Sequence, residues 1–272
     1  MRISTSTMLQ QTSQSDKVQN DLTKTMHKLS SGKRINSASD DAAGLAIAKR
    51  LEAMSRGYKT AGDNIDYAIN ALNIADSGSS SVSDILQRQS ELATQASSDT
   101  LTDSDRQALN KEYQSLNEEL ARTTESTQYN NMDLINGQSD LSDGSGTVQS
   151  GASATDQTEL PATDLTGATS SSGDISTAAG AQAALQSVSQ SLESVSATRA
   201  SIGATVNTLE HESNINRVME IYNTDAESRI EDLDYAQGVM DLARQELLNQ
   251  TATDAKKNFN QITKHTVLGL LQ

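Results

Sequence analysis

The chain has 272 residues, no cysteine or tryptophan, one phenylalanine, one proline and a formal net charge of −15. This charge argues against nucleic acid as a partner, because binding phosphates requires a basic surface. Hydrophobic residues make up 35% of the chain and aromatic residues 3%, which is too little for a thick globular core. We therefore predict an elongated helical bundle whose core is a narrow seam of small and aliphatic side chains.

A thin apolar stripe marks the first segment of the chain. Val18, Leu22 and Met26 recur at helical spacing among serine, threonine and glutamine, which predicts a helix. Such a stripe buries little surface alone, so we expect this helix to need partners. The segment lacks the apolar core of a secretory signal, and no apolar run in the chain approaches the roughly 20 residues that span a bilayer. We therefore expect no membrane insertion.

A polar stretch then interrupts the helical pattern, in the sequence LSSGKRINSASDDAAGLAIAKRLEA of residues 29–53. From Ile47 an apolar rhythm with steps of four and three residues runs to Ala96, which predicts a helix about 75 Å long. The positions of this seam are Ile47, Leu51, Met54, Tyr58, Ala61, Ile65, Ala68, Leu72, Ala75, Ser79, Val82, Leu86, Gln89, Ala93 and Ala96. The stretch DSGSSS at residues 76–81 has poor helix propensity, but the rhythm continues across it, so we place it within the helix. Thr102 or Ser104 is the expected N-cap of a shorter helix that folds back antiparallel.

The middle of the chain, residues 131–178, is rich in serine, threonine, glycine and aspartate. The sequence GTVQSGASATDQTEL at residues 146–160 predicts a small β-hairpin, and the remainder is expected to be exposed loop.

A helical rhythm returns with Leu185 and continues to Tyr222, with a slip in phase near HESN. The sequence YNTDAESRIED at residues 222–232 is expected to form a second polar joint. A last helix from about Leu233 carries Leu247, Phe259 and Ile262. The predicted fold is mainly α: an elongated antiparallel helical bundle or coiled coil, formed by the N- and C-terminal halves, with a small β-hairpin and loop region in the middle.

No catalytic constellation is recognisable. The sequence HESNI begins like a zinc-protease motif, but Ile215 occupies the position of the second histidine. In DLSDGSGT, residues 140–147, the carboxylates are not at the alternating positions of a calcium loop. Glycine-rich phosphate-binding patterns are absent. We therefore expect no enzyme activity, no cofactor and no metal site.

Several longer motifs carry a resemblance to a known family. These are the stretch at residues 29–53 quoted above, NIDYAINALNIAD, LQRQSELATQASS, STQYNNMDLING, NTLEHESNIN and ESRIEDLDYA. In this order they resemble bacterial flagellin, the subunit of the flagellar filament, over roughly residues 2–137 and 184–272. The opening MRISTSTMLQQ is closer to the hook–filament junction proteins of the same superfamily.

The resemblance implies a division of the chain into five parts. Residues 1–42 would form an N-terminal inner-tube helix and joint, and residues 43–130 and 179–224 the two parts of a helical rod. Residues 131–178 would form a short β and loop variable region, and residues 225–272 a joint and C-terminal inner-tube helix. The helices of the inner tube would pack through Val18, Leu22, Met26, Leu247, Phe259 and Ile262. At the first joint, Gly32 permits a change of direction, and polar contacts between subunits would come from Lys33, Arg34, Asp40 and Asp41.

The resemblance also implies partners and a location. The chain would polymerise with itself into an extracellular filament that transmits motor torque for swimming, after export without a cleaved signal peptide. The implied partners are the flagellar export apparatus, an export chaperone, and the hook-associated and cap proteins. Arg88, Leu92 and Glu112 match positions at which receptor-activating flagellins contact the flagellin-sensing Toll-like receptor. From the residues alone, Arg88 and Glu112 could equally pair with each other or remain solvated.

Two alternatives remain open at this point. One is a hook–filament junction protein or a minor flagellin variant of the same superfamily. The other is a soluble coiled-coil signalling adaptor, which would form oligomers of fixed size rather than filaments.

Overall fold

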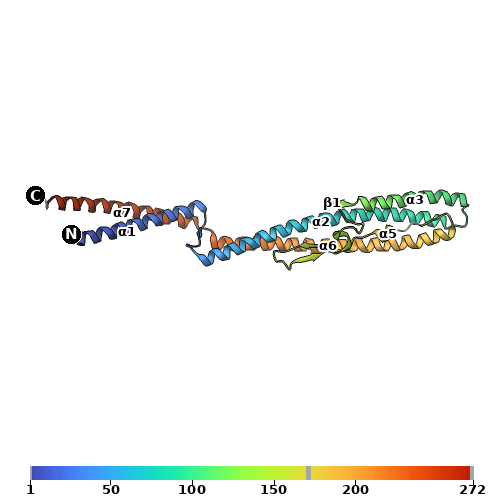
Figure 1. The fold of residues 1–272 in the computed structure, drawn as a ribbon, viewed down its shortest axis with the longest axis horizontal. Helices are drawn as coiled ribbons and strands as arrows, with labels where there is room; N and C mark the ends of the chain where they lie inside the picture. Colours follow the sequence, from blue (N-terminus) through green and yellow to red (C-terminus); the bar gives the residue numbers. More distant parts are fainter. Residues whose placement is uncertain (1, 170–172, 270–272) are drawn as a thin grey trace. The chain divides into compact units, whose positions relative to one another are not determined.

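The computed structural model describes residues 2–169 and 173–269 and is mainly helical, with two small antiparallel sheets between its N- and C-terminal halves (Figure 1). This confirms the predicted fold class. The chain divides into two structural units: residues 1–53 with 222–272, and residues 54–221.

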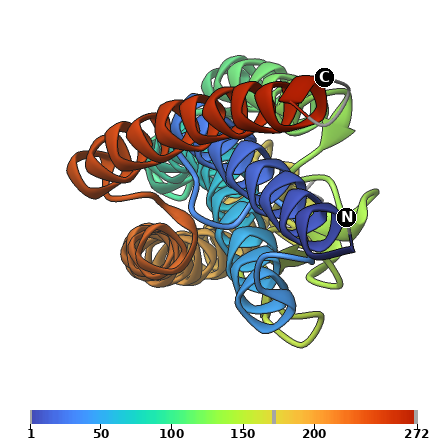
Figure 2. The same cartoon turned by 90° about the vertical axis from the view of Figure 1, so that its left-hand side faces the viewer.

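The first unit is built around two long terminal helices, α1 (Arg2–Ser31) and α7 (Tyr235–Gly269). They lie side by side and antiparallel, so that α1 begins where α7 ends (Figure 1, Figure 2). Close to the joint, the side chain of Leu29 packs against Gly238, where an added Cβ would come within 3.3 Å of Leu29 Cδ2. The less exposed positions of α1 follow a heptad spacing and are partly polar: Gln11, Ser15, Val18, Leu22, Thr25 and Leu29.

The second unit is organised by two helices that also reach into the first unit, α2 (Ala42–Ala96) and α6 (Ala178–Glu231). The predicted seam of α2 is confirmed between Ala61 and Ala96, where every predicted position is buried. Ile47 and Met54, at the start of the predicted seam, are instead exposed. The stretch DSGSSS lies within α2, as predicted. Leu72 of α2 and Val188, Val195 and Leu209 of α6 belong to one apolar core.

The shorter helix α3 (Asp103–Ser126) begins at a capping box. The Thr102 hydroxyl accepts a hydrogen bond from the Asp105 backbone N–H, and the Asp105 carboxylate accepts one from the Thr102 N–H. Thr102 is therefore the N-cap, and Ser104 lies inside the helix. Buried Arg106 donates to the carbonyls of Ala96 and Ser98, which satisfies acceptors left free at the end of α2.

Two hairpins and two short helices follow α3. The first hairpin joins β1 (Gln128–Tyr129) to β2 (Met132–Asp133) through Asn130 and Asn131, whose φ angles are 48° and 66°. Asparagine tolerates the positive φ angles that a two-residue hairpin turn needs. After α4 (Asp140–Asp143), β3 (Thr147–Gln149) pairs with β4 (Gln157–Glu159), which confirms the predicted hairpin of residues 146–160. The helix α5 (Thr166–Thr169) follows.

The prediction that the rest of this middle region is exposed loop is wrong. Leu134, Ile135, Leu165 and Ile175 are at most 2% exposed and belong to the core. They stand singly or in pairs among polar residues, so no period of two or 3.6 residues marked them in the sequence. The second hairpin is also attached to α6, because Asn216 donates to the Ser150 carbonyl over 2.7 Å.

The predicted second polar joint is mostly helix, so this expectation is also wrong. Helix α6 continues to Glu231, and the helical pattern is broken only at residues 232–234 before α7. The stretch of residues 222–231 is polar but contains neither glycine nor proline. Without a strong helix breaker, polar composition alone does not end a helix. An ion pair of 2.9 Å between Arg229 and Asp225, one turn apart, further supports this last part of α6.

Candidate functional site

The joint between α1 and α2 is tied to the joint between α6 and α7 by backbone hydrogen bonds. Gly32 ends α1 with a φ of 70°, a conformation that glycine adopts at little cost. Its carbonyl accepts a hydrogen bond of 2.9 Å from the Leu233 N–H, and the Arg34 N–H donates to the Glu231 carbonyl over 2.6 Å. Lys33 and Asp232 form an antiparallel bridge. The two connections therefore run side by side and pair as a minimal antiparallel β-ladder.

Charged side chains add further contacts between the two connections. Lys33 Nζ lies 3.0 Å from Glu231 Oε1, and the Glu231 side chain is only 5% exposed. The Arg34 guanidinium donates to the Ile230 carbonyl over 2.6 Å. Beside them, Ile35 is 1% exposed and packs against Gly44, where an added Cβ would come within 2.8 Å of Ile35 Cδ1. Sequence reasoning missed Ile35 because a single apolar residue in a polar loop forms no periodic pattern.

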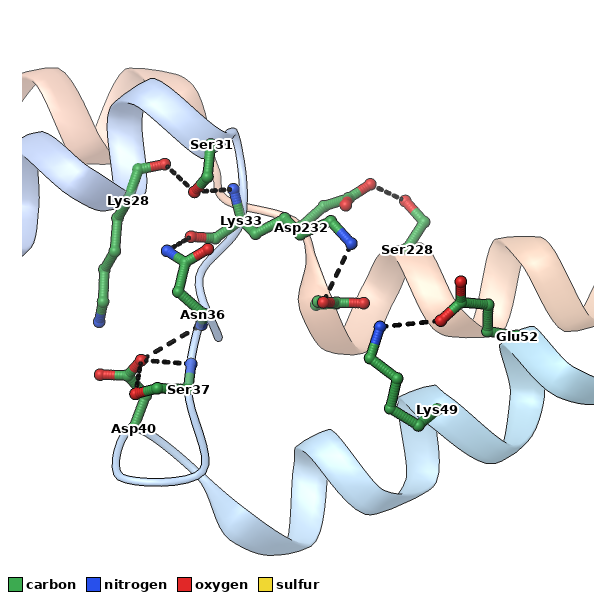
Figure 3. A network of polar contacts seen from close by, with 11 residues as sticks. Lys28, Ser31, Lys33, Asn36, Ser37, Asp40, Lys49, Glu52, Ser228 and Asp232 are labelled. Atoms are coloured by element: carbon green, nitrogen blue, oxygen red, sulfur yellow. Dashed lines mark hydrogen bonds and ion pairs between the residues drawn. The ribbon is translucent and has the colours of Figure 1, made fainter.

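The two aspartates of the joint fix the chain just before α2 and at its first turn; Figure 3 shows the contacts of Asp40. Asp40 Oδ2 accepts hydrogen bonds from the Asn36 N–H, the Ser37 N–H and the Ser37 hydroxyl. Asp41 Oδ1 accepts a hydrogen bond of 2.8 Å from the Gly44 N–H, which is the contact of a helix N-cap. Lys33, Arg34, Asp40 and Asp41 thus all have partners within the chain, and their contacts between subunits remain a prediction.

Asp40 is expected to titrate below the ordinary aspartate range of about 3.9. The Ser37 hydroxyl, followed by the backbone N–H of Asn36, holds the pKa of the Asp40 carboxyl low by bonding to its charged form. A lowered folded-state pKa contributes stability above the unfolded pKa that is lost as the pH falls through the folded value. An NMR titration should show this low pKa, and Ser37→Ala should raise it. An ordinary pKa in both proteins would contradict the hydrogen-bond geometry.

Helices α1 and α7 also expose large apolar side chains. We call these the outer faces of α1 and α7: Leu9, Met26, Tyr235, Val239, Met240, Leu247, Leu248 and Ile262. Of the six residues predicted to pack in an inner tube, Met26, Leu247 and Ile262 are 50 to 66% exposed. Leu22 is buried within the unit, and Val18 and Phe259 are half-buried. The outer faces are the largest group of unburied apolar side chains described in the first unit.

The residues matched to a receptor contact lie in the second unit. Arg88 Nη2 lies 2.8 Å from Glu112 Oε1 across α2 and α3, and Arg88 Nη1 lies 2.8 Å from Glu91. These hydrogen bonds, first that to Glu112, raise the pKa of Arg88. Leu92 is only 1% exposed, because it packs into the core. Arg88 and Glu112 therefore lie at the surface and Leu92 does not, and the receptor contact of these residues stays a prediction.

Across the part of the chain that the structure describes, no group of three or more histidine, cysteine or acidic side chains is placed to hold a metal ion. Within the same residues, no helix is both long enough and apolar enough to cross a membrane.

Comparisons with known proteins match both the N-terminal and the C-terminal part of the chain. The model of the bacterial flagellin N-terminal helical region matches residues 3–140, and that of the C-terminal helical region matches residues 185–271. The chain belongs to the bacterial flagellin family. The unmatched residues 141–184 hold the second hairpin, α5 and the start of α6.

Relatives of this flagellin match along most of its length. It is 38% identical to a flagellin of Halalkalibacterium halodurans over 254 residues, covering 92% of this chain and 91% of that protein. It is 32% identical to a flagellin of Listeria monocytogenes over 255 residues, 88% of each chain. A flagellar filament 33 kDa core protein of Treponema phagedenis is 30% identical over 264 residues, 92% of each chain.

Solved structures resemble this flagellin as well. The crystal structure of Bacillus cereus flagellin matches with a TM-score of 0.51 and 26% identity, covering 56% of this chain and 88% of that one. A putative flagellar hook-associated protein from Vibrio parahaemolyticus matches with a TM-score of 0.59 and 16% identity, covering 71% and 100%. The second likeness shows a shared fold.

Family membership decides the class of function. Flagellins are structural proteins, and this chain is a subunit that polymerises with itself into the flagellar filament, through which motor torque drives swimming. Its place is the bacterial flagellum. The predicted absence of enzyme activity agrees with the structural role of the family.

Proposed function

We propose that the filament is held together at its centre by the outer faces of α1 and α7, each buried against other copies of the chain. The observation that supports this is the exposure of eight large apolar side chains on two neighbouring helices. Large apolar side chains left exposed on two helices that contact each other favour an interaction site there. In the predicted set, Met26, Leu247 and Ile262 would contact other copies, while Leu22 already packs within the chain.

The mixed polarity of the contact between α1 and α7 supports the same proposal. Positions of α1 with reduced exposure include Gln11, Ser15 and Thr25, and the partly buried Gln245 of α7 has a buried Oε1 without a hydrogen-bond partner. Ordering one residue costs about 1–2 kcal/mol of backbone entropy. A seam of mixed polarity offsets little of that entropy cost. Burial of apolar side chains against further copies would supply the remaining stabilisation.

Within this proposal, residues 1–42 and 225–272 keep the role of inner-tube helices with their joints. Residues 43–130 and 179–224 form the outer helical part, and residues 131–178 the short β and loop region. Lys33, Arg34, Asp40 and Asp41 add polar contacts between subunits beside Gly32. Their exposed surfaces are available for contacts with another subunit. Lys33, for example, remains 41% exposed while it is paired with Glu231.

Limited proteolysis of monomer and filament tests the proposal. In dilute monomer, protease should remove residues 1 to about 33 and about 232 to 272, and leave a resistant helical core of about residues 43–222 that forms no filament. In filaments the same ends should be protected, because neighbouring copies cover them. Fully protected ends in dilute monomer, or normal polymerisation of the trimmed core, would contradict the proposal.

Export and assembly partners belong to the same proposal. We infer that the chain leaves the cell through the flagellar export apparatus with the help of an export chaperone, and without a cleaved signal peptide. Hook-associated and cap proteins would then meet its ends during assembly. Mass spectrometry of filaments should find the N-terminal segment MRISTSTMLQQ intact, with or without the initiator methionine, whereas a signal peptide cleaved further along would remove it.

A second proposal concerns Arg88 and Glu112. We propose that these two exposed side chains contact the flagellin-sensing Toll-like receptor, without Leu92. The support is that both lie at the surface of α2 and α3 and are joined by an ion pair of 2.8 Å. Arg88→Ala should weaken receptor activation by purified monomer. The exchange Arg88→Glu with Glu112→Arg keeps an ion pair but reverses its direction, so it should weaken activation as well. Full receptor activation by both variants would show that Arg88 and Glu112 are not part of the receptor contact.

A further inference from the structure

Methionine is unusually exposed in this protein. Every methionine whose side chain the structure describes is at least 37% exposed: Met26, Met54, Met132, Met219 and Met240. Methionine is ordinarily among the most buried residue types. The chain also has no cysteine and no tryptophan, so among the described side chains these thioethers are accessible targets for a two-electron oxidant.

Two of the five lie on the outer faces defined above. Met26 is 50% exposed on α1, and Met240 is 60% exposed on α7. The packing of Leu29 against Gly238 places them at a common level of the helix pair. Met26 precedes Leu29 by three residues and Met240 follows Gly238 by two, so that both lie about 3–5 Å beyond that contact along their helices. The two thioethers are therefore exposed at a similar level along the helix pair.

We propose that Met26 and Met240 are oxidation sites through which an oxidant of the peroxide class prevents the subunit from joining the filament. This inference rests on the proposed function of the outer faces. The sulfur lone pair attacks one peroxide oxygen, the O–O bond breaks and an S–O bond forms. The sulfur loses two electrons and the peroxide is reduced. With hydrogen peroxide, the second oxygen leaves as water after it takes the proton of the transferred hydroxyl.

The product changes the surface that has to be buried. Methionine sulfoxide carries a strong, hydrogen-bonding S–O dipole in place of a soft apolar thioether. A contact that buries the oxidised side chain leaves this dipole without water, which is costly unless a donor is present. Because each subunit carries both residues, every oxidised subunit that joins the filament bears this cost of burial.

The test compares seeded assembly before and after oxidation. Full-length monomer is treated with dilute hydrogen peroxide, conversion of each methionine is measured by peptide mass spectrometry, and the critical concentration is determined on sheared filament seeds. Oxidised wild-type protein should need at least about a tenfold higher concentration, the change that loss of one apolar contact produces. Treatment with methionine sulfoxide reductase and a thiol should restore assembly. Lasting inhibition would assign the loss to other damage and overturn the proposal.

Two matched variants locate the effect. Met26→Leu with Met240→Leu keeps the apolar volume and should assemble equally well with and without peroxide. Met54→Leu with Met219→Leu should remain as sensitive as the wild type. Equal inhibition of both variants, or unchanged assembly of wild-type protein with both sulfoxides formed, would overturn the proposal. If Leu247→Asp blocks assembly but oxidation does not, only the oxidation inference fails. If Leu247→Asp assembles normally, the proposed function itself fails.

Discussion

Leu247→Asp is expected to abolish filament growth while leaving the helical content of the monomer unchanged. Leu247 is 66% exposed in the single chain, so a polar replacement removes no core contact there. In the filament the proposal buries it, and burying a leucine side chain is worth about 1.5–3 kcal/mol. A carboxylate at the same place adds the cost of an unpaired charge. Together these raise the critical concentration by more than about a hundredfold.

The measurement is sedimentation of protein added to sheared filament seeds, with circular dichroism of the monomer beside it. Leu247→Met is the matched control, because it keeps the volume and the apolar character of the side chain, and it should assemble as the wild type does. Normal growth of the aspartate variant would show that this side of α7 remains exposed in the filament.

Leu165→Ala should destabilise the second unit as strongly as Leu72→Ala, by about 2–5 kcal/mol each. Leu165 lies in the middle region, residues 131–178, and Leu72 lies in α2. Both are at most 3% exposed and belong to one core. Deleting either side chain leaves a cavity in a packed interior.

Thermal unfolding followed by circular dichroism would measure both losses. Asp76→Asn is the control: Asp76 pairs with Arg199 over 2.8 Å, but the two side chains are 41% and 39% exposed, and such pairs contribute about 1 kcal/mol or less. If Leu165→Ala changed the unfolding temperature no more than Asp76→Asn does, the middle region would not be part of the core.

The seam of α2 could be predicted from the sequence because its signal is long and regular. Steps of four and three residues between Ala61 and Ala96 place one stripe of side chains along a helix, and that stripe is buried. The regularity also carried the prediction across DSGSSS, where propensity alone would have broken the helix. Where the stripe reaches Ile47 and Met54, the same pattern continues but the side chains are exposed. Periodicity identifies the apolar side of a helix, and it does not say whether the same chain covers that side.

The middle region and the joint were less predictable because their anchors are isolated. Ile35 and Leu165 are at most 1% exposed, but a lone apolar residue in a polar loop carries no period. Leu92 shows the opposite case: resemblance to receptor-binding flagellins placed it in a contact set, but its side chain fills the core. The outer faces could be anticipated in part, since Leu247 and Ile262 were expected to need partners beyond their own helix.

The chain contains no native cysteine, so a single introduced thiol reports directly on one position. The rate at which a soluble maleimide labels Leu247→Cys, compared between monomer and filament, tests whether the outer face of α7 is buried on assembly. Asp99→Cys, at an exposed turn after α2, provides the reference rate for a thiol in the other unit. Labelling at position 247 should slow at least about tenfold in the filament relative to that reference. An equal rate in monomer and filament would contradict this burial.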